Sequence, residues 1–194
     1  MFFLINILIF LLFFPASFGL LWQTFTIDNL SSQLISFAFF LFSLEQARMA
    51  FLDLRGLFVS YQKINRQLFL IFVFVFLLTI LIELYGFYLS LFSLGWGAIF
   101  VLLSQIWFNL FAPIKLNNDD KLTFHNYYFK EKISVLITDI IGLILMMLWT
   151  FNIGKLIISI VMVILTSLFL LIKYSNPLSN CQKMTQINFP RIEG

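Results

Sequence analysis

The chain has 194 residues, of which 61% are hydrophobic and 11% are charged, and its formal net charge is +3. A soluble domain carries about 25% charged residues because its surface faces water, so this composition excludes an ordinary soluble protein and indicates one covered mostly by lipid. The single cysteine, Cys181, and the single histidine, His125, exclude an internal disulfide, a Cys₄ or Cys₂His₂ metal site and paired histidine ligands for haem.

Six segments have the length and character of membrane-spanning helices. Such a helix needs about 20 mostly apolar residues, and we expect spans at residues 2–22, 31–51, 68–89, 97–114, 133–153 and 156–173. The predicted fold is therefore an all-α integral membrane bundle, with a single domain over residues 1–174 and a polar cytoplasmic tail over residues 175–194.

The first two spans each raise an alternative. We expect the first to be a retained helix bent by Pro15. The alternative is a cleaved signal over residues 1–19, since Ser17-Phe18-Gly19 offers a small-x-small pattern, although no positive n-region precedes it. The second span has a short apolar core, and we expect its helix to continue beyond the membrane through residues 49–61 as an interfacial stretch.

The basic residues indicate the orientation of the six spans. With this count, Lys155 alone falls on one side, and all the other basic residues fall on the opposite side. Those residues are Arg48, Arg55, Lys63, Arg66, Lys115, Lys121, Lys130, Lys132, Lys173, Lys183 and Arg191. The positive-inside rule makes their side cytoplasmic and places both termini there.

Aromatic residues support the same orientation. Trp and Tyr are enriched at the headgroup level, where one end of the ring is apolar and the other is wet. The residues expected near the outer ends of the spans are Trp22, Tyr85, Tyr88, Trp96 and Trp149.

Glu83 is the one charged residue between Gln67 and Ile114. A carboxylate inside a bilayer costs several kcal/mol unless it is paired or neutral, so it normally faces protein or water. Its neighbours at helical spacing are Thr79, Gly86 and Ser90, and small residues let another helix approach closely. We therefore expect Glu83 to point into the bundle.

Other spans carry polar side chains that depth along the helices sorts into two layers, at a rise of about 1.5 Å per residue. The outer layer contains Glu83, Gln105 and Ser36, and the inner layer contains Asp139, Asn109 and Arg48. One interpretation is interhelical hydrogen bonding, with Glu83 protonated and Asp139 paired with Arg48. The other is a stepped polar path for a proton or a small cation. We favour the first, because even a scaffold needs polar contacts between its helices.

No motif for catalysis or cofactor binding is present. The HExxH, GxSxG, P-loop and Rossmann patterns are all absent, and we expect no cofactor, no catalytic residue and no metal site. His125 with Asp119 and Asp120 in the inner loop could act as an acid/base or ligate a metal, but a solvated loop is the simpler interpretation. An enzyme is thus the third hypothesis.

Two functional hypotheses lead. The first is a subunit or an assembly and stabilising factor of a larger membrane complex, whose partners are the lipid bilayer and another membrane protein or a second copy of the chain. The second is a small transporter or channel for protons, ions or a small solute, which uses Glu83 and Asp139. The inner loops mix acidic with basic residues, and nothing in the sequence supports binding to nucleic acid.

Overall fold

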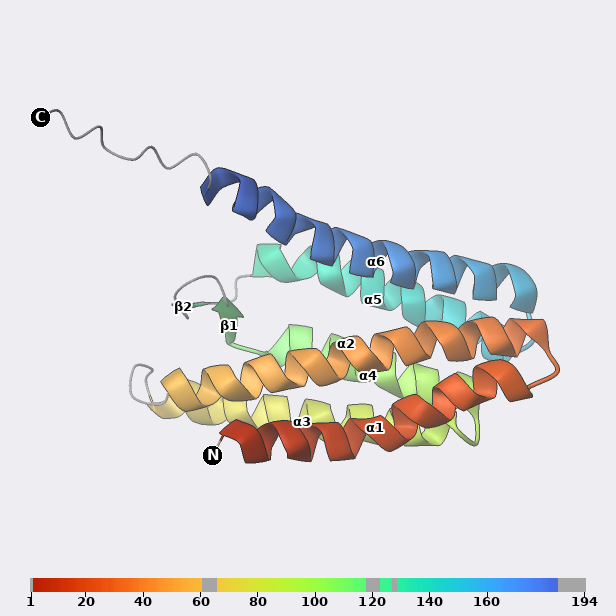
Figure 1. The fold of residues 1–194 in the computed structure, drawn as a ribbon, viewed down its shortest axis with the longest axis horizontal. Helices are drawn as coiled ribbons and strands as arrows, with labels where there is room; N and C mark the ends of the chain where they lie inside the picture. The colour runs from red at the N-terminus through yellow and green to blue at the C-terminus, as the bar shows by residue number, and fades with distance from the viewer. Residues whose placement is uncertain (1, 61–65, 118–122, 127–128, 185–194) are drawn as a thin grey trace, which may run out of the picture.

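The computed structural model describes residues 2–60, 66–117, 123–126 and 129–184, and the side chains of residues 9, 11–54, 66–113, 132–133, 135–171 and 174. Within these residues there are six helices and one hairpin (Figure 1). The helices are α1 (Phe2–Thr26), α2 (Leu30–Ser60), α3 (Arg66–Ser90), α4 (Leu94–Phe111), α5 (Phe129–Thr150) and α6 (Lys155–Met184), and the strands are β1 (Ile114–Asn117) and β2 (Thr123–Asn126).

Each predicted span overlaps one helix, but the spans predicted at 97–114 and 133–153 run three residues past the ends of α4 and α5. Three helices are long and apolar enough to cross a membrane, over Leu30–Leu54, Arg66–Ser90 and Leu94–Phe111. Shorter apolar helical stretches cover Leu11–Thr26, Val135–Thr150 and Lys155–Leu171. The expected continuation of the second helix is confirmed as far as Ser60. Helix α1 continues unbroken through Pro15.

Two elements differ from the prediction. The segment expected to be an inner loop contains the antiparallel β1–β2 hairpin, in which Lys115 pairs with His125, so the fold is helical with one small hairpin. Helix α6 continues to Met184, into the segment predicted as a tail. The remaining tail residues, 185–194, and the basic residues Lys63, Lys121 and Arg191 lie outside the described part.

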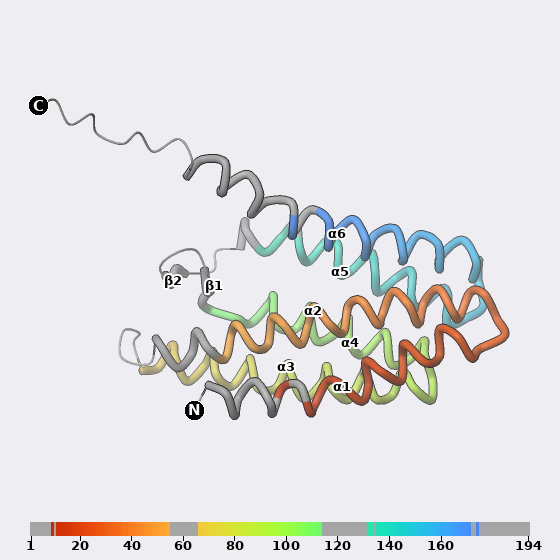
Figure 2. Tube along the Cα trace, viewed as in Figure 1, coloured from red at the N-terminus to blue at the C-terminus, as the bar shows by residue number. Residues whose placement is uncertain are grey.

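The helices alternate in direction, because the connections at residues 27–29, 91–93 and 151–154 are too short for anything but antiparallel neighbours. These three connections lie at one end of the bundle, which we call the turn end (Figures 1 and 2). The hairpin, the start of α1 and the end of α6 lie at the other end, the hairpin end.

The helices form a closed ring in the order α1, α2, α6, α5, α4, α3, in which each helix packs on both of its neighbours. Helix α2 also contacts α4 across the ring. This contact divides the bundle into a first half, made of α1, α2, α3 and α4, and a second half, made of α2, α4, α5 and α6.

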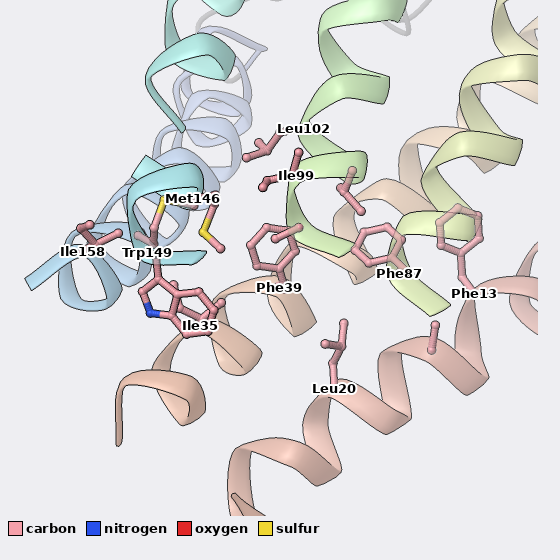
Figure 3. Close-up of a cluster of buried hydrophobic side chains, with 14 of the residues drawn as sticks. Phe13, Leu20, Ile35, Phe39, Phe87, Ile99, Leu102, Met146, Trp149 and Ile158 are labelled. Carbon is pink, nitrogen blue, oxygen red and sulfur yellow. The ribbon is translucent and has the colours of Figure 1, made fainter. Parts of the chain in front are cut away.

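The main hydrophobic core lies toward the turn end. Every helix contributes to it, and Figure 3 labels Phe13, Leu20, Ile35, Phe39, Phe87, Ile99, Leu102, Met146, Trp149 and Ile158. A smaller cluster of Phe72, Val75, Phe76 and Ala112 joins α3 to α4 toward the hairpin end.

Trp149 differs from the other aromatic residues predicted at the outer ends of the spans. Trp22, Tyr85, Tyr88 and Trp96 are exposed, but Trp149 is only 5% exposed. Its indole Nε1 donates to the hydroxyls of Ser31 at 2.8 Å and Ser159 at 3.0 Å. Trp149 thus fastens α5 to α2 and α6, and its assignment to an aromatic belt was wrong.

Candidate functional site

The interface between α3 and α4 is closely packed, because glycines on both helices let the two backbones approach. A Cβ atom added to Gly86 would lie 2.9 Å from the backbone nitrogen of Val101 and 3.0 Å from the carbonyl oxygen of Gly97. A Cβ atom added to Gly97 would overlap the side chain and the backbone of Ser90. Real Cβ atoms almost never come so close to backbone, so neither position has room for a side chain.

Glu83 lies in this interface. It is 3% exposed, and its Oε1 accepts a hydrogen bond of 2.6 Å from Nε2 of Gln105 on α4. Thr79, Gly86 and Ser90, which were predicted to share its face, are buried as well. The structure therefore brings together the two side chains that were assigned to the outer layer on α3 and α4.

Asn109 connects this pair to α5. Its Nδ2 donates to the backbone oxygen of Gln105 at 2.9 Å and to Oδ2 of Asp139 at 3.1 Å. Glu83, Gln105, Asn109 and Asp139 thus form a continuous polar chain across three helices, which we call the polar ladder.

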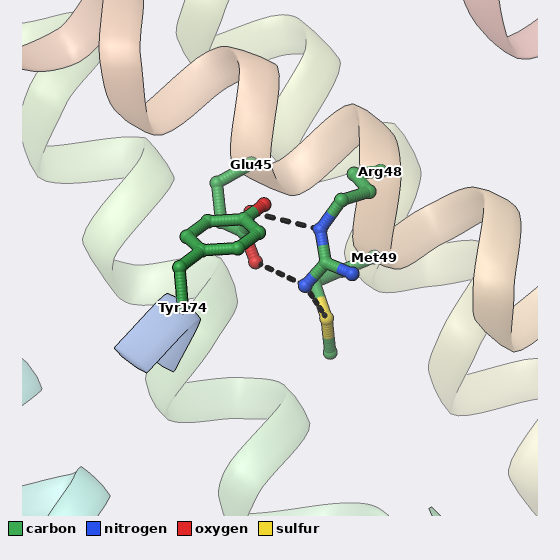
Figure 4. Close-up of polar contacts among 4 residues, drawn as sticks. All are labelled: Glu45, Arg48, Met49 and Tyr174. Carbon is green, nitrogen blue, oxygen red and sulfur yellow. Dashed lines mark hydrogen bonds and ion pairs between the residues drawn. The ribbon is translucent and has the colours of Figure 1, made fainter. Parts of the chain in front are cut away.

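Arg48 is not part of the polar ladder, although it was predicted to pair with Asp139. Its Nε and Nη2 donate to Glu45 at 3.0 and 2.7 Å (Figure 4). The hydroxyl of Tyr174 on α6 donates to the same carboxylate at 2.7 Å, and the guanidinium lies 5.3 Å from the centre of the Tyr174 ring. Glu45 is one turn from Arg48 on the same helix, so it is the nearer partner.

Ser36 also lies away from Glu83. Its hydroxyl is 3.5 Å from Oε1 of Gln23 on α1, and Nε2 of Gln23 donates to the backbone oxygen of Leu91 at 2.7 Å. Depth along a helix does not determine the direction in which the helix presents a side chain.

A cavity of about 320 Å³ lies in the second half of the bundle, between α2, α4, α5 and α6. Most of its lining is apolar, and the polar residues in the lining are Gln46, Gln105, Thr138, Asp139 and Thr166. Gln105 and Asp139 therefore belong both to the polar ladder and to the cavity wall, whereas Glu83 and Arg48 do not line the cavity. Ligand pockets commonly begin at about this volume and combine an apolar lining with a few polar groups.

Lys132 joins the ends of two helices, a role that the sequence did not predict. In the sequence it counted only as one of the positive charges that indicate the orientation. It is 7% exposed, and its Nζ donates to the backbone oxygen of Ala112 at 2.7 Å, just beyond the last turn of α4. Burial lowers the pKa of Lys132 below its ordinary value. A cation at this position complements the negative end of the α4 dipole and fixes α5 against α4.

The third hypothesis rested on His125, Asp119 and Asp120. The backbone of His125 lies in β2, while Asp119 and Asp120 lie outside the described residues. Among the residues that the structure describes, no group of three or more His, Cys, Asp or Glu side chains could hold a metal ion.

Comparison with known proteins gives this chain no relative. It matches no family model, no curated protein and no solved structure. The class of protein is therefore defined by the fold alone: a bundle of six helices in the described part, three of which are long and apolar enough to span a membrane.

Proposed function

We propose that the chain is an integral membrane protein with six spans and both termini on the cytoplasmic side. The helices that carry the three shorter apolar stretches are 25, 22 and 30 residues long. At about 1.5 Å per residue, even the shortest reaches about 33 Å, which matches the hydrocarbon core of a bilayer. The turn end would then face outward, and the hairpin end, with most of the basic residues, would face the cytoplasm.

Cysteine labelling tests this orientation. The native Cys181 should react with a membrane-impermeant maleimide only after the cells are lysed. In a Cys181→Ser chain, single cysteines that replace Asn29, Phe92 or Asn152 in the three connections of the turn end should react in intact cells. Reaction of Asn29→Cys and Phe92→Cys from opposite sides of the membrane would contradict the six-span count.

Within this orientation, we infer that the protein binds a small solute in the cavity, as a small transporter does. The observation that carries the proposal is that Asp139 lines an otherwise mostly apolar cavity between four helices. Ionisable groups inside membrane proteins usually face the bundle interior and mark solute or ion pathways. Asn109 orients the Asp139 carboxylate, and Gln105 adds a second polar group to the same wall.

The subunit hypothesis, which came first from the sequence alone, is now the second candidate, and a different observation favours it. The Glu83–Gln105 hydrogen bond is enclosed in the glycine interface of α3 and α4 and does not require a solute to explain it. A polar contact of that kind is what a scaffold needs to hold its helices together. Under this hypothesis the partner is another membrane protein or a second copy of the chain.

Native mass spectrometry distinguishes the two candidates. The chain would be tagged, released from its own membrane in mild detergent and weighed intact. The solute proposal expects a small non-covalent adduct that survives Gly142→Ala but is lost in Gly142→Leu, because the longer side chain fills the cavity. A stoichiometric protein partner, with no adduct sensitive to Gly142, would favour the subunit hypothesis.

A further inference from the structure

We propose that the solute is an arylalkylammonium, a primary ammonium group on a short chain that ends in an aromatic ring. This inference rests on the proposed function, because it names the class of molecule that the cavity takes. Three features of the cavity wall lead to it: the hydrogen-bonding groups left over after the polar ladder forms, the aromatic lining, and the length of the cavity.

The hydrogen bonds of the polar ladder leave acceptors at the cavity. Asp139 accepts from Asn109 through Oδ2, and Gln105 uses its Nε2 to donate to Glu83. In the part of the chain whose side chains are described, Oδ1 of Asp139 and Oε1 of Gln105 receive no hydrogen bond. A carboxylate oxygen and an amide oxygen on one wall favour a ligand with several N–H donors.

The charge of the lining also favours a ligand with N–H donors, and specifically a cationic one. Asp139 is the one ionisable residue among the described residues that line the cavity. Two cations on these helices have partners outside the cavity lining, Arg48 with Glu45 and Lys132 with the end of α4. A cationic ligand suits a carboxylate in an apolar wall, because the charge-assisted hydrogen bond offsets the cost of taking it out of water.

The rest of the lining suits an aromatic ring. Phe39 and Phe42 on α2 and Phe169 on α6 line the cavity together with Leu102 and Met162. Aromatic side chains pack on other rings edge to face or offset, and Met sulfur makes favourable contacts with ring edges. A purely polar ligand would place no apolar surface against these side chains.

The cavity is long enough for such a molecule. Its lining runs from Ala38 to Gln46 along α2 and from Val135 to Gly142 along α5. At about 1.5 Å per residue these stretches extend about 10–12 Å along the bundle. Asp139 lies between the ends of its stretch, so an ammonium group at Asp139 leaves several ångströms for a two-carbon chain and a ring.

Equilibrium dialysis tests the proposal with radiolabelled 2-phenylethylammonium and the full chain in phosphatidylcholine nanodiscs, with empty nanodiscs subtracted. We expect saturable binding of one molecule per chain. The neutral 2-phenylethanol and the anionic 3-phenylpropanoate, which have a similar shape, should bind at least about tenfold more weakly.

Variants connect the binding to the cavity. Asp139→Asn keeps an acceptor for Asn109 and should weaken binding of the amine at least about tenfold. Asp28→Asn removes an exposed carboxylate in the α1–α2 connection, and the affinity for the amine should stay within about twofold of that of the unchanged chain. Gly142→Leu should abolish binding, and Thr166→Leu, a smaller change in the same lining, should weaken it. Size-exclusion profiles and melting temperatures establish that each variant is folded, and Thr166→Leu replaces Gly142→Leu if the latter is not monodisperse.

The outcomes separate the two proposals. If the alcohol binds as tightly as the amine, Asp139→Asn has no effect and Gly142→Leu still abolishes binding, the ligand class is wrong and the cavity remains a solute site. If no probe shows binding that depends on Gly142 or Thr166, both the ligand class and the solute site are overturned. Binding of the amine that is unchanged in Asp139→Asn and in the cavity-filling variants places the site elsewhere and also overturns both.

Discussion

The two halves of the bundle treat a buried carboxylate in different ways. In the first half, Glu83 bonds to Gln105 where glycines bring α3 and α4 into backbone contact. In the second half, Asp139 bonds to Asn109 beside a cavity of about 320 Å³. Each carboxylate has a side-chain amide as its partner, so the chemistry of the pair does not distinguish them. The packing around each pair does: Glu83 lies in a closed interface between helices, whereas Asp139 lines a cavity, and this difference is the basis of the proposal that Asp139 binds a solute.

The largest effect is expected from a methyl group at the glycine interface. Gly97→Ala places a Cβ against the backbone of Ser90 and Gly86, and overpacking of this kind costs about 1–3 kcal/mol or more. Gly142→Ala is the matched control, since its Cβ would lie 3.5 Å from Leu102, an ordinary contact. Thermal unfolding in detergent should show a much lower melting temperature for Gly97→Ala and an unchanged melting temperature for Gly142→Ala. Equal melting temperatures would remove the contrast in packing between the two halves.

Truncation of the two carboxylates should give the next largest difference. Glu83→Ala leaves the amide of Gln105 without its partner in a closed interface, and interhelical hydrogen bonds in membranes are worth about 0.6 kcal/mol on average and up to about 1.7. Asp139→Ala leaves Asn109 its bond to the backbone of Gln105 and should cost less. Glu83→Gln retains an acceptor and serves as the control. The stability of the variants would be compared by unfolding in detergent. A larger loss of stability in Asp139→Ala than in Glu83→Ala would contradict the view that Glu83, and not Asp139, holds the helices together.

Lys132 tests how the second half is fastened at the hairpin end. Lys132→Met keeps the length of the side chain but removes the donor to the end of α4, which should cost about 1 kcal/mol. Lys132→Arg supplies a similar donor and should lose less. Hydrogen exchange at the last turn of α4 would locate the change, and faster exchange spread over α3 instead would contradict this role.

The smallest effect is expected from Tyr174→Phe. Tyr174 is 48% exposed, and loss of its hydroxyl removes one bond to Glu45 while the Arg48–Glu45 ion pair remains. This hydrogen bond is only partly buried, and we expect it to contribute about 0.5 kcal/mol. Glu45 does not line the cavity, but the next residue, Gln46, does, so we expect faster dissociation of a bound ligand and little change in melting temperature. Stopped-flow dissociation measures the rate, and an unchanged rate would separate this contact from the cavity.

Much of the fold follows from the sequence. Each of the six predicted spans overlaps a helix of the structure, because long apolar runs separated by short polar connections leave few alternatives for the chain. The stripe of Thr79, Glu83, Gly86 and Ser90 identified a buried face, since small and polar residues are rarely placed against lipid. The hairpin and the extension of α6 were missed, because their residues are polar and carry no strong periodic signal.

The partners of the polar side chains depended on the tertiary structure. Arg48 was assigned to Asp139 by depth, but the i, i+3 spacing to Glu45 on the same helix was the stronger signal and was available in the sequence. No local pattern connects Tyr174 to Glu45, or Ser31 and Ser159 to Trp149, because the partners lie on different helices.

The sequence by itself determined that the chain is mostly helical and apolar, where its helices lie, and which helix faces carry polar groups. The tertiary structure alone decided that Glu83 meets Gln105 in a closed interface, that Asp139 borders a cavity, and that α2 and α4 divide the ring. The physical reason is that residues facing lipid and residues facing the core are equally apolar, so hydropathy marks where a helix lies but not which neighbour it meets. That choice depends on the fit of whole helix surfaces, such as Gly97 against Ser90, which exists only once the helices are packed.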